Sequence, residues 1–122
     1  MTDGGTLQPA RDGDARYDRR DPDLTKFQLR ILAILADEAR YGLAIKDALE
    51  AYYEEEVFHG RLYPNADQLV EEGYVEKSAL DKRTNLYEIT AEGRAVLEDE
   101  LEWVAFKAGY ELERSQEGGR DA

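Results

Sequence analysis

The segment from Gly60 to Gly93 constrains the fold more than any other part of this chain. Apolar residues over its first part recur at helical spacing and fall on one face: Leu62, Ala66, Leu69 and Val70. Gly73 then ends the helix, because glycine accepts the backbone conformation that closes a helical C-terminus. Two short extended runs follow, over residues 74–80 and 86–89, and the polar residues 81–85 separate them. The segment is therefore predicted to be a helix followed by a β-hairpin.

A new helix is predicted directly after the hairpin. Thr90 precedes Ala91, Glu92 and Gly93, and its hydroxyl can accept a hydrogen bond from a free amide at a helix start. Helix, hairpin and helix in this order are typical of a recognition helix with a wing. The predicted fold class is mainly α with a small β-hairpin, a winged helix-turn-helix with a C-terminal dimerisation helix.

Two helices are predicted upstream of this segment. The first begins at Thr25, which has capping-box spacing with Gln28, and its apolar residues Phe27, Ile31, Leu32 and Leu35 indicate a core helix. Tyr41 and Gly42 open the second, the first helix of the helix-turn-helix. Its apolar positions are Leu43, Ile45, Ala48, Leu49 and Tyr52.

The last predicted helix carries more apolar surface than one small core needs. Its stripe includes Leu97, Leu101, Val104 and Ala108, and Trp103 lies on an adjoining stripe. A helix over residues 91–112 would be about 33 Å long, enough to extend beyond a winged domain. We interpret it as a dimerisation helix; the alternative is that both stripes cover the first helix.

The predicted organisation has four parts. Residues 1–24 form a flexible N-terminal arm, 25–90 a winged helix-turn-helix DNA-binding domain, 91–112 the dimerisation helix and 113–122 a flexible tail. The arm contains Arg11, Arg16, Arg19 and Arg20, so it is either a solvated tail or an extension that touches phosphate or the minor groove.

The formal net charge of -12 is unusual for a chain of this predicted fold. A DNA duplex is itself strongly negative, and its binders ordinarily carry surplus lysine and arginine. The acids are unevenly spread, however: residues 73–90 hold Glu76, Asp81 and Glu88 against Lys77, Lys82 and Arg83, so the hairpin is locally neutral. Scarce lysine with abundant Asp and Glu indicates the cytoplasm of a salt-loving microbe, where inorganic ions are possible additional partners.

Several classes of function lack support in the sequence. There is no cysteine, which excludes thiolate metal sites and thiol switches in this chain. His59 is the only histidine, and no nucleophile and base pair, phosphate-binding loop or metal motif is present, so neither catalysis, a metal site nor a cofactor is predicted. The run Glu54 to Glu56 reads as a solvated face rather than a cation site. No segment resembles a signal peptide or a membrane span, and a cytoplasmic protein without membrane association is expected.

The chain resembles the PadR family of winged-helix transcription regulators over roughly residues 25–98. The resemblance rests on residues that match G-x-L-Y-P, L-E-E-G and Y-x-[IL]-T-x-E-G motifs: Gly60, Leu62, Tyr63, Pro64, Leu69, Glu71, Glu72, Gly73, Tyr87, Thr90, Glu92 and Gly93. Tyr41 and Gly42 match the start of the family's second helix. The chain departs from the family where Asp67 and Gln68 replace frequent basic residues, and where residues 81–85 replace a glycine-arginine wing tip.

The resemblance implies a homodimer that binds double-stranded DNA at a pseudo-palindromic promoter site. Within the family the chain resembles haloarchaeal regulators of the oxidative-stress response, which implies control of genes answering reactive oxygen species. The dimer contacts would come from residues of the last helix: Leu97, Leu101, Trp103, Val104 and Ala108. The alternative function is a winged-helix module for protein interaction that does not bind DNA.

Side chains with defined chemistry for DNA lie on the predicted helix and wing. Arg61 suits guanine or phosphate and Asn65 and Gln68 suit adenine. Tyr63 offers a contact or packs the helix start, and Tyr41 reaches phosphate or packs at a helix entry. At the wing tip Lys82 and Arg83, assisted by Thr84 and Asn85, can reach phosphates or a minor groove, although a charged turn also serves solubility. His59, just before the helix, either packs locally or contacts a phosphate. Asp67 is unfavourable near phosphate unless it accepts from a cytosine amine or binds a bridging cation.

Overall fold

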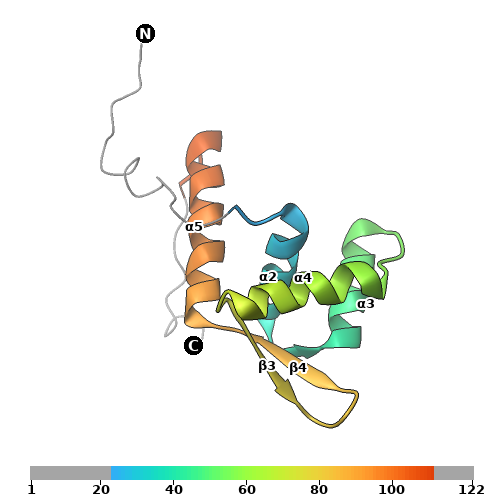
Figure 1. Cartoon of the computed structure of the whole chain (residues 1–122). Helices are drawn as coiled ribbons and strands as arrows, with labels where there is room; N and C mark the ends of the chain where they lie inside the picture. Colours follow the sequence, from blue (N-terminus) through green and yellow to red (C-terminus); the bar gives the residue numbers. More distant parts are fainter. Residues whose placement is uncertain (1–22, 112–122) are drawn as a thin grey trace, which may run out of the picture. The chain divides into compact units, whose positions relative to one another are not determined.

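The computed structural model describes residues 23–111, which form two compact units, 23–98 and 99–111. The elements in chain order are α2 (Lys26–Asp37), β2 (Arg40–Tyr41), α3 (Gly42–Tyr53), α4 (His59–Glu71), β3 (Val75–Ala79), β4 (Asn85–Ile89) and α5 (Ala91–Ala108). Figure 1 shows the β3–β4 hairpin extending beyond α2, α3 and α4. The predicted mainly α fold with a winged helix-turn-helix is confirmed. The predicted arm and tail lie outside the described residues, apart from residues 23 and 24.

The core of the first unit forms where α2, α3 and α4 meet the base of the hairpin. Its fully buried side chains are Ile31, Leu32, Leu35, Ile45, Leu49, Val57, Leu62, Leu69 and Tyr87. The predicted capping box starts α2: Gln28 N donates to Thr25 Oγ1 at 3.1 Å, and Thr25 N donates to Gln28 Oε1 at 3.0 Å. The apolar stripes predicted for α2 and α4 therefore face the core, whereas Leu43 and Tyr52 of the stripe predicted for α3 are 62% and 49% exposed.

The hairpin is part of a three-stranded antiparallel sheet with strand order β2–β4–β3. The β3–β4 register pairs Glu76 with Glu88 and Lys77 with Tyr87. The third strand, β2, was not predicted, because two residues are too few for an alternating pattern to emerge. It pairs Arg40 with Tyr87, and so ties the start of α3 to the wing.

Two glycines and a threonine fix the base of the hairpin. Gly73 has a φ of 87°, and Tyr74 N donates to Leu69 O at 2.9 Å, which closes α4. Thr90 Oγ1 donates to Gly73 O at 2.7 Å and accepts from Gly93 N at 3.0 Å, confirming the predicted N-cap. A Cβ on Gly93 would overlap the carbonyl oxygen of Tyr74. The T-x-E-G motif therefore locks the wing against the first turn of α5.

The last helix ends at Ala108, four residues before the predicted Leu112. Gly109 takes a φ of 86°, and Tyr110 N donates to Ala105 O at 2.8 Å across the last turn. Glycine adopts this left-handed conformation without steric cost, so it ends the helix even though apolar residues continue beyond it. No described helix combines the length and the apolar character needed to cross a membrane.

The connection between α3 and α4 depends on Glu50. Its carboxylate accepts from Val57 N and from Lys46 Nζ, both at 2.9 Å. The Val57 amide, followed by Lys46, lowers the pKa of Glu50. Glu54, Glu55 and Glu56 are exposed, as the prediction of a solvated face requires.

Candidate nucleic-acid interface

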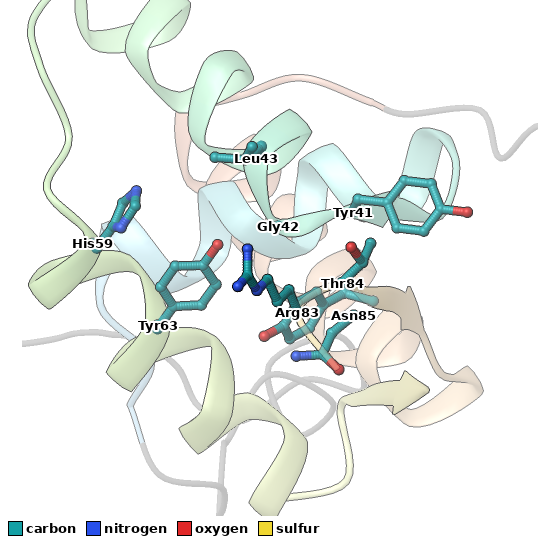
Figure 2. A pocket seen from close by; sticks show the side chains of 9 residues that line it. Tyr41, Gly42, Leu43, His59, Tyr63, Arg83, Thr84 and Asn85 are labelled. Carbon is teal, nitrogen blue, oxygen red and sulfur yellow. The ribbon is translucent and has the colours of Figure 1, made fainter. Parts of the chain in front are cut away.

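A hollow opens where the start of α3, the first turns of α4 and the wing converge (Figure 2). Its volume is about 340 Å³. The lining residues come from all three elements: Tyr41, Gly42, Leu43, His59, Tyr63, Arg83, Thr84, Asn85 and Tyr87. Four predicted contact residues, Tyr41, Tyr63, Arg83 and Thr84, are thus brought together from three segments that are far apart in the sequence.

Tyr63 lies against the start of α3 because residue 42 is glycine. A Cβ at Gly42 would approach the Tyr63 hydroxyl oxygen to 2.5 Å. His59 meets the Tyr63 ring edge-on, with ring centroids 5.5 Å apart. The α3 N-cap residue, Tyr41, makes no side-chain capping bond. A tyrosine hydroxyl and a helix start with an uncapped positive end therefore face the same hollow, which is favourable for an anion.

The wing tip points a guanidinium into this hollow. In Figure 2 the Arg83 side chain extends toward Tyr63, whereas the Tyr41 ring points away. The Asp81 carboxylate accepts from Arg83 N at 2.8 Å and Thr84 N at 2.9 Å, so it shapes the tip. The Arg83 amide is the main reason why the pKa of Asp81 is lowered. Lys82 is exposed at the same tip but does not line the hollow.

Tyr87 forms the buried floor of the hollow. Its burial, with a smaller contribution from the nearby Asp67 carboxylate, raises the pKa of Tyr87 to about 12. The phenol is therefore neutral near pH 7. Tyr87 and Asn85 lie on the same face of β4, and both line the hollow.

The other predicted residues of α4 lie on its opposite flank, toward α2. The Arg61 guanidinium carbon lies 4.0 Å from the centroid of the Phe27 ring and 5.7 Å from that of Tyr53. Asn65 Nδ2 donates to Arg61 O at 2.8 Å. Gln68 accepts from Gln28 and donates to Glu72, both at 3.3 Å. Contacts within the protein hold these side chains in place, and none of them lines the hollow.

An ion pair joins the outer face of α4 to the wing. Lys77 Nζ lies 3.0 Å from Asp67 Oδ1, and both side chains are partly exposed. Lys77 also lies over the Tyr87 ring, 6.0 Å from its centroid. Asp67, which the sequence marks as unfavourable for DNA, is therefore charge-compensated by a wing residue.

The reverse face of the hairpin is acidic. It carries Glu76 and Glu88, which pair across the strands. A wide, shallow hollow of about 980 Å³ beside the base of the hairpin is lined by these two acids, by Glu72 and Glu92, and by Lys77. Within the described residues no cluster of three His, Cys, Asp or Glu side chains is arranged to hold a metal ion.

The second unit, described by itself, is a helical segment with a mostly exposed surface. Leu101, Trp103 and Val104 are 56%, 39% and 49% exposed, and Ala108 is exposed as well. Lys107 Nζ lies near the Trp103 and Phe106 rings, at 5.7 and 5.9 Å. Leu97, which precedes this unit, packs against the core of the first one.

Sequence reasoning gave no contact role to three of the residues that line the hollow, Gly42, Leu43 and Tyr87, whereas His59 and Asn85 were expected as accessory contacts. Gly42 and Tyr87 belong to matched motifs, but their role as a contact for Tyr63 and as a floor depends on long-range packing. Asn85 was placed in the tip, yet it begins β4 and pairs with Ala79.

Comparison with known proteins gives a consistent family and fold. The family model described as "Transcriptional regulator PadR-like family" matches residues 31–99. RosR of H. salinarum, from crystals grown from NaBr, is 60% identical, with a TM-score of 0.70 over 74% of this chain and 82% of that chain. The hsRosR-S4 complex structure is 54% identical, with a TM-score of 0.70 over 83% and 84% of the two chains. A transcriptional regulator from Clostridium thermocellum, at 24% identity and a TM-score of 0.58 over 67% and 84%, shares the fold. No curated protein matches the chain.

Proposed function

The chain belongs to the PadR-like family of transcriptional regulators, and on that premise we propose that it binds double-stranded promoter DNA as a homodimer. The observation that carries the proposal is the hollow in which the α3 start, Tyr63 of α4 and Arg83 of the wing converge. Each of these groups is suited to a phosphate oxygen, and they approach from three different elements. Such a constellation fixes the register of a duplex on the protein.

The groups of the hollow have separate roles in this proposal. Arg83 and Lys82 reach phosphates or the minor groove from the wing, and Thr84 adds a hydroxyl donor. Tyr63 donates its hydroxyl to a phosphate oxygen beside the α3 start. Tyr41, whose ring is 43% exposed and points out of the hollow, contacts the next phosphate along the backbone.

Base contacts are assigned to α4. Arg61 stacks on Phe27, and stacking leaves the edge of the planar guanidinium open to guanine O6 and N7. Asn65 and Gln68 are the proposed adenine readers. Their present bonds, to the Arg61 carbonyl and to Gln28 and Glu72, would be exchanged for bonds to bases on binding.

Dimerisation is assigned to the exposed surface of α5. Leu101, Trp103, Val104 and Ala108 present apolar area that a second copy would cover. A twofold dimer would set two copies of α4 on half-sites about 34 Å apart. The identity of 54–63% to the RosR structures supports extending the proposal to genes that answer reactive oxygen species in a halophilic archaeon.

Titration of fluorescent promoter fragments at molar KCl tests DNA binding. The expected result is saturable, sequence-selective binding that two purified variants, Arg61→Ala and Lys82→Ala, weaken. Light scattering tests the dimer separately: the wild type should be a dimer at micromolar concentration, and Trp103→Glu should be a monomer that binds DNA less tightly. Absence of binding across a broad fragment library would contradict the proposal.

A second function is favoured by the acidic face beside the base of the hairpin, where Glu72, Glu76, Glu88 and Glu92 line one hollow. That face would repel phosphate and attract a basic protein. The winged domain would then be a protein-interaction module that does not bind DNA. The same library titration separates the two functions, because the module would leave every fragment unbound.

A further inference from the structure

Asp67 is on the outer face of α4, opposite the buried Leu62, Ala66 and Leu69. Its side chain is 52% exposed, and Oδ1 accepts from Lys77 Nζ at 3.0 Å. The second carboxylate oxygen, Oδ2, has no partner among the described residues. One oxygen is thus held by the wing, and the other is left without a partner in the described part of the chain, on the helix that the proposed function places in the major groove.

The pair is not explained by fold stability. Ion pairs between partly exposed side chains contribute little to folding, because water screens both charges. Nor is Lys77 free to act as an ordinary phosphate contact, because its ammonium is directed at Asp67 and lies near the Tyr87 ring. The pair instead compensates the charge of the Asp67 carboxylate, which would otherwise repel a phosphate backbone.

We propose that Asp67 is a specificity-determining residue that accepts a hydrogen bond from the N4 amine of a cytosine, and that Lys77 positions and neutralises it. This inference rests on the proposed DNA-binding function. In the major groove, guanine and thymine present acceptors that a carboxylate repels. Adenine presents an amine beside the N7 acceptor, whereas cytosine presents an amine without an adjacent acceptor. A carboxylate with one free oxygen therefore selects cytosine.

High salt favours recognition by a carboxylate that contacts a base edge over recognition by lysines that contact phosphates. Counterion release contributes less to binding as salt rises, so lysines that contact phosphates lose much of their effect. A hydrogen bond to a base edge acts at contact distance, well within the Debye length of about 3 Å at molar salt. Asp67 stands where family members often carry a basic residue. At high salt this replacement therefore increases sequence selectivity and lowers the affinity for DNA only a little.

The test is selection from a randomised double-stranded DNA library at molar KCl, with the full chain. The wild type should enrich a motif with cytosine at one position of each half-site. Asp67→Asn, which keeps the shape and removes the charge, should reduce that preference about tenfold and leave the other positions unchanged. An unchanged motif, or uniform weakening without a change of preference, would overturn the inference. If the wild type enriches nothing, the proposed function itself fails.

A second measurement tests the role of Lys77. Lys77→Gln should weaken binding to every sequence about tenfold, because it leaves the Asp67 charge uncompensated beside phosphates. Adding Asp67→Asn should then restore most of the loss. If Lys77 instead binds phosphate directly, the double variant will bind as weakly as Lys77→Gln, and the positioning role is refuted.

Lys82→Gln is the matched control, since the described residues offer this wing-tip lysine no acidic partner. It should weaken binding to the same degree with and without Asp67→Asn. Circular dichroism melts should show that all these surface variants fold. Coupling of Asp67 to Lys82 as strong as that to Lys77 would show that general electrostatics, rather than the pair, accounts for the result.

Discussion

The two faces of the β3–β4 hairpin differ in charge although they share one backbone. The face toward α4 carries Lys77, Asn85 and Tyr87, and the tip directs Arg83 into the hollow on that side. The reverse face carries Glu76 and Glu88, which are directly opposite each other in the register. Residues alternate between faces along a strand, so five-residue strands suffice to separate the two chemistries.

This contrast shows why a net charge of -12 does not decide whether the chain can bind DNA. Charges act on a duplex mainly within about a Debye length, which is short at high salt. The acids of the reverse face are held away from the hollow by the thickness of the sheet. In the proposed complex the α4-facing side of the hairpin is therefore the side that approaches the polyanion.

The largest predicted effect concerns Gly93, at the base of the hairpin that carries both faces. Gly93→Ala should lower the free energy of unfolding by about 3 kcal/mol, because the new Cβ would overlap a backbone carbonyl that has no room to move. Thermal or urea unfolding would measure the loss. Both the DNA-facing and the acidic surface should be disturbed together.

Gly60→Ala is the matched control for this glycine substitution. A Cβ at Gly60 meets nothing within 4 Å. Because alanine favours a helix more than glycine does, this variant should be more stable by up to about 1 kcal/mol. Equal losses in the two variants would show that the Thr90 and Gly93 clamp does not hold the wing.

The second prediction compares one residue from each side. Arg83→Ala should raise the dissociation constant for promoter DNA about tenfold, equivalent to about 1.4 kcal/mol, because it removes a cation from the hollow. Glu88→Gln should change it by less than about twofold, since its carboxylate lies on the far face. Fluorescence anisotropy at two salt concentrations measures both. If Glu88→Gln tightens binding as much as Arg83→Ala weakens it, the two faces are not electrically separate.

The third prediction concerns how much the acidic face of the hairpin lowers the free energy of unfolding. Glu76 and Glu88 are a like-charge pair across the strands, so Glu88→Lys should raise the unfolding free energy by about 0.5 kcal/mol in dilute buffer. The gain should shrink at molar KCl, where the repulsion is already screened. Unfolding curves at both salt concentrations provide the measurement. Combining Glu88→Lys with Glu76→Lys restores a like-charge pair and should cancel the gain.

The sequence predicted the elements whose signals are local. The capping box of α2, the stop at Gly73, both hairpin strands and the Thr90 cap follow from chemistry within a few residues. The end of α5 was misplaced, because the apolar pattern continues past Gly109 and the left-handed glycine overrides it.

The candidate site was predictable only in part. Tyr63, Arg83 and Thr84 were predicted as contacts and are found together, because the L-Y-P motif identifies Tyr63 and the polar turn between two strands identifies Arg83 and Thr84. The pairing of Asp67 with Lys77, the stacking of Arg61 on Phe27 and the bond from Gln28 to Gln68 join separate elements. Contacts of that kind depend on how the helices cross, which no local pattern specifies.

The smallest predicted effect is at the wing tip, which connects β3 to β4. Asp81 holds the amides of Arg83 and Thr84, and its pKa is lowered because the charged carboxylate accepts these bonds. A lowered pKa means that the tip keeps its shape above the ordinary value of 3.8 and loses it as the pH falls through the folded value. Amide chemical shifts of Arg83 and Thr84 should therefore titrate with a midpoint below 3.8.

Asp81→Asn separates the shape of the tip from its charge. The asparagine carbonyl accepts the same two bonds, so the pH transition should vanish while the Arg83 orientation and DNA affinity change little. Asp81→Ala offers no acceptor, and should loosen the tip at every pH and weaken DNA binding by a few-fold at most. If the amides titrate at or above 3.8 in the wild type, Asp81 does not order the tip, and the placement of Arg83 in the hollow must depend on contacts with DNA instead.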